Sequence, residues 1–229
     1  MVTLRWELRP RVGALRDFMI VAEVYDWLMD SQRPESADTF TRHVFAASLS
    51  LCYIEAKGGY VNSALGLSHS DLLALAACFF PQRLSALSLW SLPADRQRPD
   101  DEECLMELLV QCCADQTGAG QWISLIMARR CARPNHLWQD LGLRTRDELS
   151  QVMQQYYPWL AARNSSDMKW KKFLYRIMCR DEGYGLCTAP SCAECDDFAA
   201  CFGDESGESL LARIRLDHDR ATTGTTAPA

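Results

Sequence analysis

The chain has 229 residues, 48% of them hydrophobic and 24% charged, which is the composition of a globular protein with one sizeable domain. Its formal net charge of −6 argues against a general affinity for nucleic acid or for anionic membrane surfaces. The sequence also lacks an apolar run of the roughly 18–20 residues needed to cross a membrane, and its charged N-terminus does not resemble a secretory signal. We therefore expect a cytoplasmic protein with no membrane partner.

The first half of the sequence predicts helices separated by polar breaks. Apolar residues at mixed spacings of three and four predict a helix over 12–30, and a second helix is expected from 39 to about 56. The stretch "YVNSALGLSHSDLLALAACFFP" predicts two short helices broken at Gly66, with Ser68 as the N-cap of the second and Pro81 as its end. Polar residues and two prolines predict a loop, and a candidate subdomain boundary, over 91–103.

The second half continues in the same way. Helices are expected from about 101 to 114 and around 121–132, separated by a turn at "DQTGAG". Thr145 and Glu148 predict a capping box at the start of a helix that ends near Pro158. The polar run "NSSD" then precedes a helix over "MKWKKFLYRIMCR". Since no stretch alternates with period two, the predicted fold is mainly α, a helical domain with an appended irregular C-terminal cysteine-rich loop.

The cysteine loop contains Cys187, Cys192, Cys195 and Cys201, with the spacing C-x4-C-x2-C-x5-C. Eleven cysteines in a chain without an export signal are expected to stay reduced, which disfavours disulfides. Structural zinc sites usually use two close cysteine pairs, whereas this loop has one. Its first three cysteines have the spacing of plant-type ferredoxins. The pattern therefore favours an iron–sulfur cluster, with zinc or incidental thiols as alternatives.

The helix that leads into this loop is amphipathic. One side of it gathers apolar residues, namely Trp170, Phe173, Leu174, Ile177 and Met178. A second side carries a basic stripe of Lys169, Lys172, Arg176 and Arg180. A solvated helix face explains such a stripe, and the alternative interpretation is that it attracts an anion.

Other metal-ligating residue types are weaker candidates. Cys179 lies eight residues before Cys187, so it could be an additional ligand, although a structural role is the simpler interpretation. His136 is also a candidate ligand, but a single histidine beside a tryptophan is more often a packed residue. The remaining cysteines lie in apolar helical stretches, where we expect them to belong to the core: Cys52, Cys78, Cys104, Cys112, Cys113 and Cys131.

These observations divide the chain into four parts. Residues 1–35 form a variable N-terminal segment with a helix, and 36–166 form the helical domain. Residues 167–205 contain the cluster-binding helix and the cysteine loop. Residues 206–229 form a C-terminal tail, and its end, "ATTGTTAPA", is expected to be disordered because it has no apolar anchors.

The stretch "DMKWKKFLYRIMC", followed by "GLCTAPSCAECDDFAACFG", resembles the C-terminal signature of the NifQ family of nitrogen-fixation proteins. "HLWQDLGLRTRDELS" and "YYPWLAARN" are similar to upstream segments of that family, and "FTRHVFAASLSL" with "ALGLSHSDLLAL" are similar to it less specifically. The resemblance is dense over about 136–203 and loose over 40–82.

The resemblance implies a definite function. Proteins of this family are regarded as molybdenum donors in the assembly of the nitrogenase iron–molybdenum cofactor, so we expect a metal carrier rather than an enzyme. The family implies an iron–sulfur cluster, able to hold molybdenum, on the four cysteines of the loop. It also implies NifH and the NifEN scaffold as acceptors. On this basis we hypothesise that Lys169, Lys172 and Arg176 help capture molybdate or balance the charge of the cluster.

Rival functions are less well supported. "SALGLSHSDLLAL" has the rhythm of a DNA-binding helix-turn-helix, but its second helix is apolar and acidic, so nucleic acid is not an expected partner. The nucleotide-binding motifs G-x-G-x-x-G and G-x-x-x-x-G-K-[ST] are absent, as is the C-x3-C-x2-C triad of radical enzymes. The alternatives that stay open are an iron–sulfur electron carrier without molybdenum and a zinc-binding structural or interaction protein.

Overall fold

The computed structural model describes residues 21–56, 60–91 and 98–181. All regular secondary structure within these ranges is helical, which confirms the prediction of a mainly α fold. The predicted cysteine loop and C-terminal tail, and the first 20 residues, lie outside the described residues. The elements are α1 (Val21–Met29), α2 (Thr39–Glu55), α3 (Val61–Leu65), α4 (His69–Phe79), the 3-10 helix η1 (Pro81–Arg83), α5 (Leu84–Ser88), α6 (Asp100–Cys112), α7 (Gly118–Cys131), α8 (Leu137–Asp140), α9 (Arg146–Tyr156), α10 (Pro158–Arg163) and α11 (Trp170–Asp181).

Local capping signals were good predictors of the helix ends. Helix α3 ends at Gly66, whose φ of +74° lies in the left-handed region that favours glycine. A Cβ at this position would also lie only 2.8 Å from the Cβ of Arg129 on α7. The predicted N-cap of α4 is confirmed, because the Ser68 hydroxyl accepts a hydrogen bond from the N–H of Asp71 in a complete capping box.

Two prolines begin helices where the sequence was interpreted as a helix end. Pro81 opens η1, which leads into α5, and Pro158 opens α10, a helix that was not predicted. Proline is tolerated at the first helical position because the N–H that it lacks would have no intrahelical partner there. The predicted ends of α4 and α9 are correct, and the error was to expect no helix after them.

The capping box predicted for Thr145 and Glu148 is only half formed. The Thr145 hydroxyl accepts a hydrogen bond from the N–H of Glu148, as expected. The Glu148 carboxylate, however, accepts from the N–H of Arg144 at 2.7 Å instead of that of Thr145, and it also pairs with His43. A contact with α2, which is distant in the sequence, therefore competes with the local motif.

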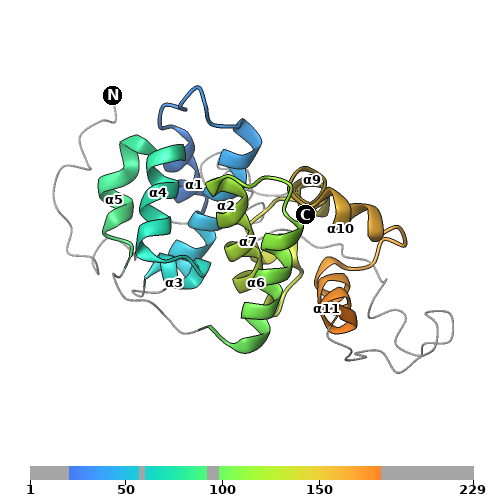
Figure 1. Ribbon diagram of the computed structural model, residues 1–229. Helices are drawn as coiled ribbons and strands as arrows, with labels where there is room; N and C mark the ends of the chain where they lie inside the picture. The colour runs from blue at the N-terminus through green and yellow to red at the C-terminus, as the bar shows by residue number, and fades with distance from the viewer. Residues whose placement is uncertain (1–20, 57–59, 92–97, 182–229) are drawn as a thin grey trace, which may run out of the picture.

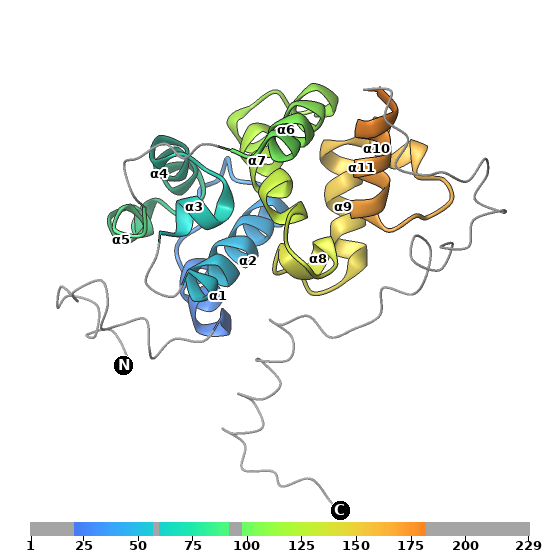
Figure 2. The ribbon, with the colours of Figure 1, turned by 90° about the horizontal axis from the view of Figure 1, so that it is seen from below.

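The helices surround a core to which all parts of the described chain contribute. Buried side chains extend from Val24 and Leu28 of α1 to Phe173 and Leu174 of α11. In Figure 1, α1–α5 lie on the left, α6 and α7 at the centre and α9–α11 on the right. Helix α7 contacts α3, α4, α6 and α8, and α11 packs against α6. The view from below shows α8 beside α9, with α10 and α11 farther out (Figure 2).

None of the described helices combines the length and the apolar character that crossing a bilayer requires.

Candidate functional site

The four loop cysteines, Cys187, Cys192, Cys195 and Cys201, lie outside the described residues, and so does the side chain of Cys179 at the end of α11. Within the described ranges, no group of three or more histidine, cysteine, aspartate or glutamate side chains could hold a metal ion. The cysteine site is thus a prediction from the sequence. The start of α11, with Lys169 and Lys172, belongs to the described residues, and its contacts define how it is positioned.

A rigid turn sets the position of the first residues of α11. The Asn164 side chain closes it twice, accepting a hydrogen bond from the Met168 N–H and donating one to the Met168 carbonyl, both at 2.9 Å. Asp167 has a φ of 54°, in the left-handed region that aspartate tolerates better than most residues. Arg146 donates to its carboxylate at 2.7 Å, and this hydrogen bond lowers the pKa of Asp167. The direction in which Lys169 enters α11 is therefore well determined.

Lys171 anchors this end of α11 to the corner between α7 and α8. Its ammonium lies 2.5 Å from Oδ2 of Asp140 and donates to the Arg133 carbonyl at 2.6 Å. The Asp140 side chain is only 1% exposed, and its second carboxylate oxygen accepts from Nδ2 of Asn135 at 3.0 Å. Removing one member of such a buried pair leaves a poorly compensated charge. Lys171 was not singled out in the sequence, where nothing distinguishes it from its neighbour Lys172.

A second ion pair, between a buried arginine and a half-buried glutamate, supports the same corner. Arg130 of α7 is 1% exposed and makes a forked pair with Glu55 of α2, with distances of 2.7 and 3.0 Å to the two carboxylate oxygens. Its Nε donates to the backbone carbonyl of Asp140. Helices α2, α7, α8 and α11 are thus connected through two charged side chains, and the α8 corner is held on both sides.

A pocket of about 400 Å³ opens between this corner and the first turn of α11. None of the described residues that line it is an aspartate or a glutamate; they are Pro134, Asn135, His136, Leu137, Gln139, Lys169, Lys171 and Lys172. Lys172 is exposed, whereas Lys169 and His136 are half-buried. Gln139 supports the rim, because its Oε1 accepts from the backbone N–H of His136 at 3.2 Å. The pocket therefore presents three ammonium groups together with amide and imidazole groups.

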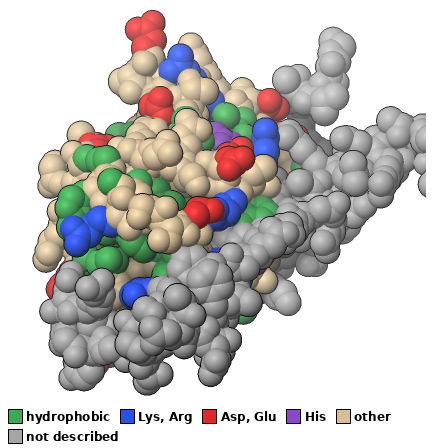
Figure 3. All heavy atoms as spheres, turned by 90° about the vertical axis from the view of Figure 1, so that its right-hand side faces the viewer, with side chains coloured by type: hydrophobic (Ala, Val, Ile, Leu, Met, Phe, Trp, Pro, Cys, Tyr) green, Lys and Arg blue, Asp and Glu red, His purple; other side chains and the backbone are tan. Residues whose placement is uncertain are grey.

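The structure divides the predicted basic stripe. Lys169 and Lys172 line the pocket, but Arg176, one turn farther along α11, does not. The apolar side of the helix is confirmed, since Trp170, Phe173 and Leu174 are buried. On the face that carries α9–α11, the described Lys and Arg side chains lie in separate places among acidic and apolar ones rather than in one continuous basic surface (Figure 3).

Cysteines of the helical body occupy three kinds of environment. Cys52, Cys113 and Cys131 are buried, and Cys104 and Cys112 are half-buried. Burial raises the pKa of Cys52 and of Cys131 to about 12, so both thiols stay protonated at neutral pH. The expectation of a core position is wrong for Cys78, which is exposed on α4. Its helix is apolar overall, and the sequence alone did not show which of its faces is covered.

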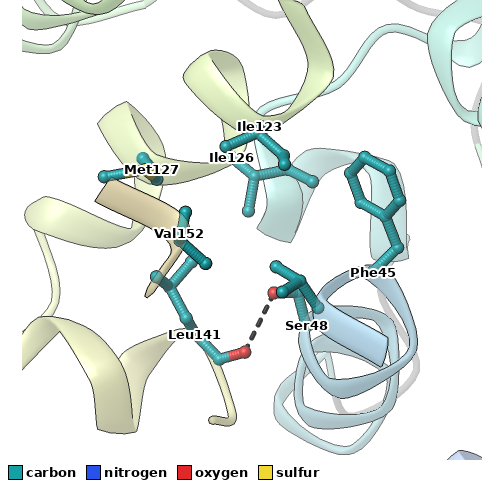
Figure 4. A pocket seen from close by; sticks show the side chains of 8 residues that line it. Phe45, Ser48, Ile123, Ile126, Met127, Leu141 and Val152 are labelled. Carbon is teal, nitrogen blue, oxygen red and sulfur yellow. Dashed lines mark hydrogen bonds between the residues drawn. The ribbon is translucent and has the colours of Figure 1, made fainter. Parts of the chain in front are cut away.

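A small void between α2, α7 and α9 has no role as a site. It measures about 10 Å³ and is lined by buried apolar side chains, among them Phe45, Ile126 and Val152 (Figure 4). Among the described lining residues, the one with a polar side chain is Ser48, whose hydroxyl donates to the Leu141 carbonyl at 2.9 Å. A space of this size is barely large enough for one water molecule, so it is a packing defect.

A part-buried chain of polar contacts links α1, α2 and α9. The Tyr25 hydroxyl lies 2.7 Å from Nδ1 of His43, and Nε2 of His43 lies 3.2 Å from the Glu148 carboxylate. Burial opposes ionisation of this carboxylate, but the hydrogen bonds from His43 and from the Arg144 N–H outweigh it and lower the pKa of Glu148. This chain is a cross-helix connection, and none of its three residues is among the described lining residues of the pocket.

The sequence was compared with known proteins. The family model named NifQ matches residues 44–203. The chain is 38% identical over 172 residues to "Protein NifQ homolog" of Sinorhizobium fredii, covering 74% of this chain and 75% of the relative. It is 40% identical over 150 residues to "Protein NifQ" of Rhodobacter capsulatus, covering 64% and 80% of the two chains, and 34% identical over 152 residues to that of Azotobacter vinelandii, covering 62% and 78%.

No solved structure shows significant similarity to the chain. The family match extends over most of the sequence and includes the described body from residue 44 onward, together with all four loop cysteines. This chain belongs to the NifQ family.

Proposed function

We propose that this protein holds molybdenum together with an iron–sulfur cluster and donates it for assembly of the nitrogenase iron–molybdenum cofactor. The observation that carries the proposal is the C-x4-C-x2-C-x5-C run inside the region that matches the family model. The spacing of the four cysteines alone does not exclude zinc as the bound metal. The same spacing within a member of a family regarded as molybdenum donors favours the cluster.

The residue types suit such a cargo. Thiolates are soft ligands that favour iron–sulfur clusters over hard cations, so Cys187, Cys192, Cys195 and Cys201 are the proposed ligands. When bound, a cluster with an incompletely occupied corner would supply iron and sulfide against which molybdenum can be held. Cys179 is a candidate for an additional thiolate during transfer. The buried body cysteines are poorer candidates, because their thiols stay protonated.

The helical body is proposed to position the loop and to supply positive charge. Lys172 and Arg176 lie on the helix that leads into it and Lys169 lies directly before its first residue, where they would attract molybdate or compensate the charge of a thiolate-bound cluster. The acceptors proposed from the family are NifH and the NifEN scaffold. Donation requires that molybdenum be bound tightly and yet be released rapidly to an acceptor. We propose that this protein acts as a metal carrier and does not itself catalyse a reaction.

Metal analysis of the anaerobically purified chain, produced in cells grown with molybdate, tests the proposal. After extensive desalting, we expect iron, acid-labile sulfide and tightly held molybdenum in the natural chain, and loss of all three when the four loop cysteines are changed to serine; molybdate that exchanges freely with the buffer is removed by the desalting and does not count. Cys78→Ser is the matched control, because this exposed thiol lies outside the loop. Zinc without iron would overturn the proposal, and iron and sulfide without molybdenum would favour the electron carrier instead.

A further inference from the structure

We infer that the lysine-lined pocket between α8 and the first turn of α11 is an oxyanion site, in which molybdate binds before it reaches the cysteines. Three lysines, two side-chain amides and an imidazole line about 400 Å³ of open space, and the lining residues that the structure describes include no carboxylate. The inference rests on the proposed function for the identity of the anion, because the pocket chemistry specifies only an oxyanion.

The groups around the pocket suit a hydrated oxyanion. Lysine ammonium groups and amide N–H groups donate hydrogen bonds to oxygen, and those from a charged donor are the stronger. One water molecule occupies about 30 Å³ of liquid, so a small anion in this space would keep part of its hydration shell. The start of α11 adds backbone N–H groups with no partner inside the helix, together with the positive end of its dipole.

The three lysines have different roles. Lys171 is paired with the buried Asp140, so its charge is largely compensated and its main effect is to hold the pocket wall in place. Lys172 is exposed on the next position of the helix and can turn toward an anion. Lys169 enters the pocket from the rigid turn that Asn164 closes. Replacing Lys169 and Lys172 should therefore lower the affinity of the pocket for an anion more than replacing other basic residues.

The pocket and the cysteine loop are attached to opposite ends of one helix. The pocket lies at the first turn of α11, whereas the loop comes after its last residue, Asp181. A helix of 12 residues is about 18 Å long at 1.5 Å per residue. Oxygen-rich anions prefer ammonium and amide groups, whereas thiolates select soft metals. The arrangement thus separates capture of the anion from retention of the metal.

Equilibrium dialysis against molybdate tests the inference without any cluster. The full-length chain with its four loop cysteines changed to serine is the starting protein, and we expect it to retain molybdate binding. Lys169→Gln with Lys172→Gln should raise the dissociation constant by at least about tenfold, because two charge-assisted hydrogen bonds are lost. Sulfate should compete with molybdate, whereas sodium chloride at equal ionic strength should compete much less.

Two controls make the result specific. Arg144→Gln with Arg163→Gln removes the same charge from exposed positions outside the pocket and should change the dissociation constant by less than about twofold. Arg176→Gln removes a charge from α11 itself, one turn beyond Lys172, and should have a much smaller effect than Lys172→Gln alone. Circular dichroism should show the same helix content in every variant.

Several outcomes would overturn the inference. These are an equal loss with Arg176→Gln and with Lys172→Gln, displacement by chloride as readily as by sulfate, or no molybdate binding at all. None of them touches the proposed function, which fails only if the natural chain carries no iron and molybdenum on its cysteines. Conversely, a pocket that binds molybdate in a protein that never retains iron would leave the inference standing without the proposed donor role.

Discussion

The cysteines of this protein occur in two contrasting regions. In the helical body, the six cysteines whose side chains are described lie on α2, α4, α6 and α7 and at the position directly after α6. Three of them are buried. Beyond α11, four cysteines occur within fifteen residues of sequence. The body disperses its thiols and keeps at least two of them protonated, whereas the C-terminal loop concentrates them.

The difference shows that cysteine content alone does not identify a metal site. A metal needs several thiolates at one place, and a buried thiol with a pKa of about 12 is a small apolar side chain. Only the sequence beyond α11 offers a close set of cysteines. The contrast raises two questions that experiments can answer. The first is whether the buried thiols of the body are unreactive in the folded protein. The second is whether the body holds α11 firmly enough to orient the cysteine loop.

The largest effect is expected in thiol labelling of the chain with its four loop cysteines changed to serine. At pH 8, Cys78 should react with a disulfide reagent at the rate of an accessible thiol, because it is exposed on α4. Cys52 and Cys131 should react at least about a thousandfold more slowly, because labelling requires both opening of the core and ionisation of the thiol. Mass spectrometry of tryptic peptides measures each site separately.

Unfolding in urea before labelling is the control, and it should remove the difference between these sites. If Cys52 or Cys131 were labelled as fast as Cys78 in the folded protein, the contrast between the two regions would be lost, and the body would have to be considered as a source of metal ligands.

The next largest effect is expected for Asp140→Asn. This change leaves the Lys171 ammonium without its buried anionic partner, so the free energy of unfolding should fall by about 3 kcal/mol. Urea denaturation measures it, and Asp147→Asn on the exposed side of α9 should change the same quantity by less than about 0.5 kcal/mol. The double variant Asp140→Asn with Lys171→Met should recover part of the loss, because it leaves no unpaired charge. Equal effects of Asp140→Asn and Asp147→Asn would contradict the proposed anchoring of α11.

A smaller, pH-dependent effect is expected for Glu148→Gln. The folded-state pKa of Glu148 is lowered, so its ionised form stabilises the protein at pH values above the unfolded pKa, and this contribution is lost as the pH falls through the folded pKa. At pH 7 the variant should be less stable by about 1 kcal/mol, and the difference from the natural chain should shrink as the pH is lowered.

Urea denaturation between pH 7 and pH 3 checks this sign, with Glu107→Gln on the exposed side of α6 as the control. A difference that grew toward acidic pH would show that burial, and not hydrogen bonding by His43 and Arg144, controls the ionisation of Glu148.

The fold could be predicted where local chemistry decides it. Ser68 and Gly66 set helix ends through side-chain capping and a left-handed φ, and both signals are visible in the sequence. The start of α10 at Pro158 was missed, because a proline that ends one helix and begins the next has the same local pattern as a simple break. The box at Thr145 is only half formed because the Glu148 carboxylate accepts from the Arg144 N–H and also pairs with His43, which is distant in the sequence.

The candidate site was predictable in its charges but not in its shape. The sequence showed that Lys169 and Lys172 share one side of a helix. It could not show that Lys171 forms an ion pair with Asp140. Nor could it show that the segment around His136 lines a pocket together with Lys169 and Lys172. Both are tertiary contacts between segments that are separated by α9 and α10, and no local pattern encodes them.

The last fully buried side chain of the described residues, Leu174, comes before the whole cysteine run. If the cysteine run holds a metal as proposed, the apolar contacts described up to Leu174 are made by residues that precede the metal ligands in the sequence. Loading and release of the proposed cargo would then leave these described contacts to residues that bind no metal, and the carrier could be reloaded while they persist.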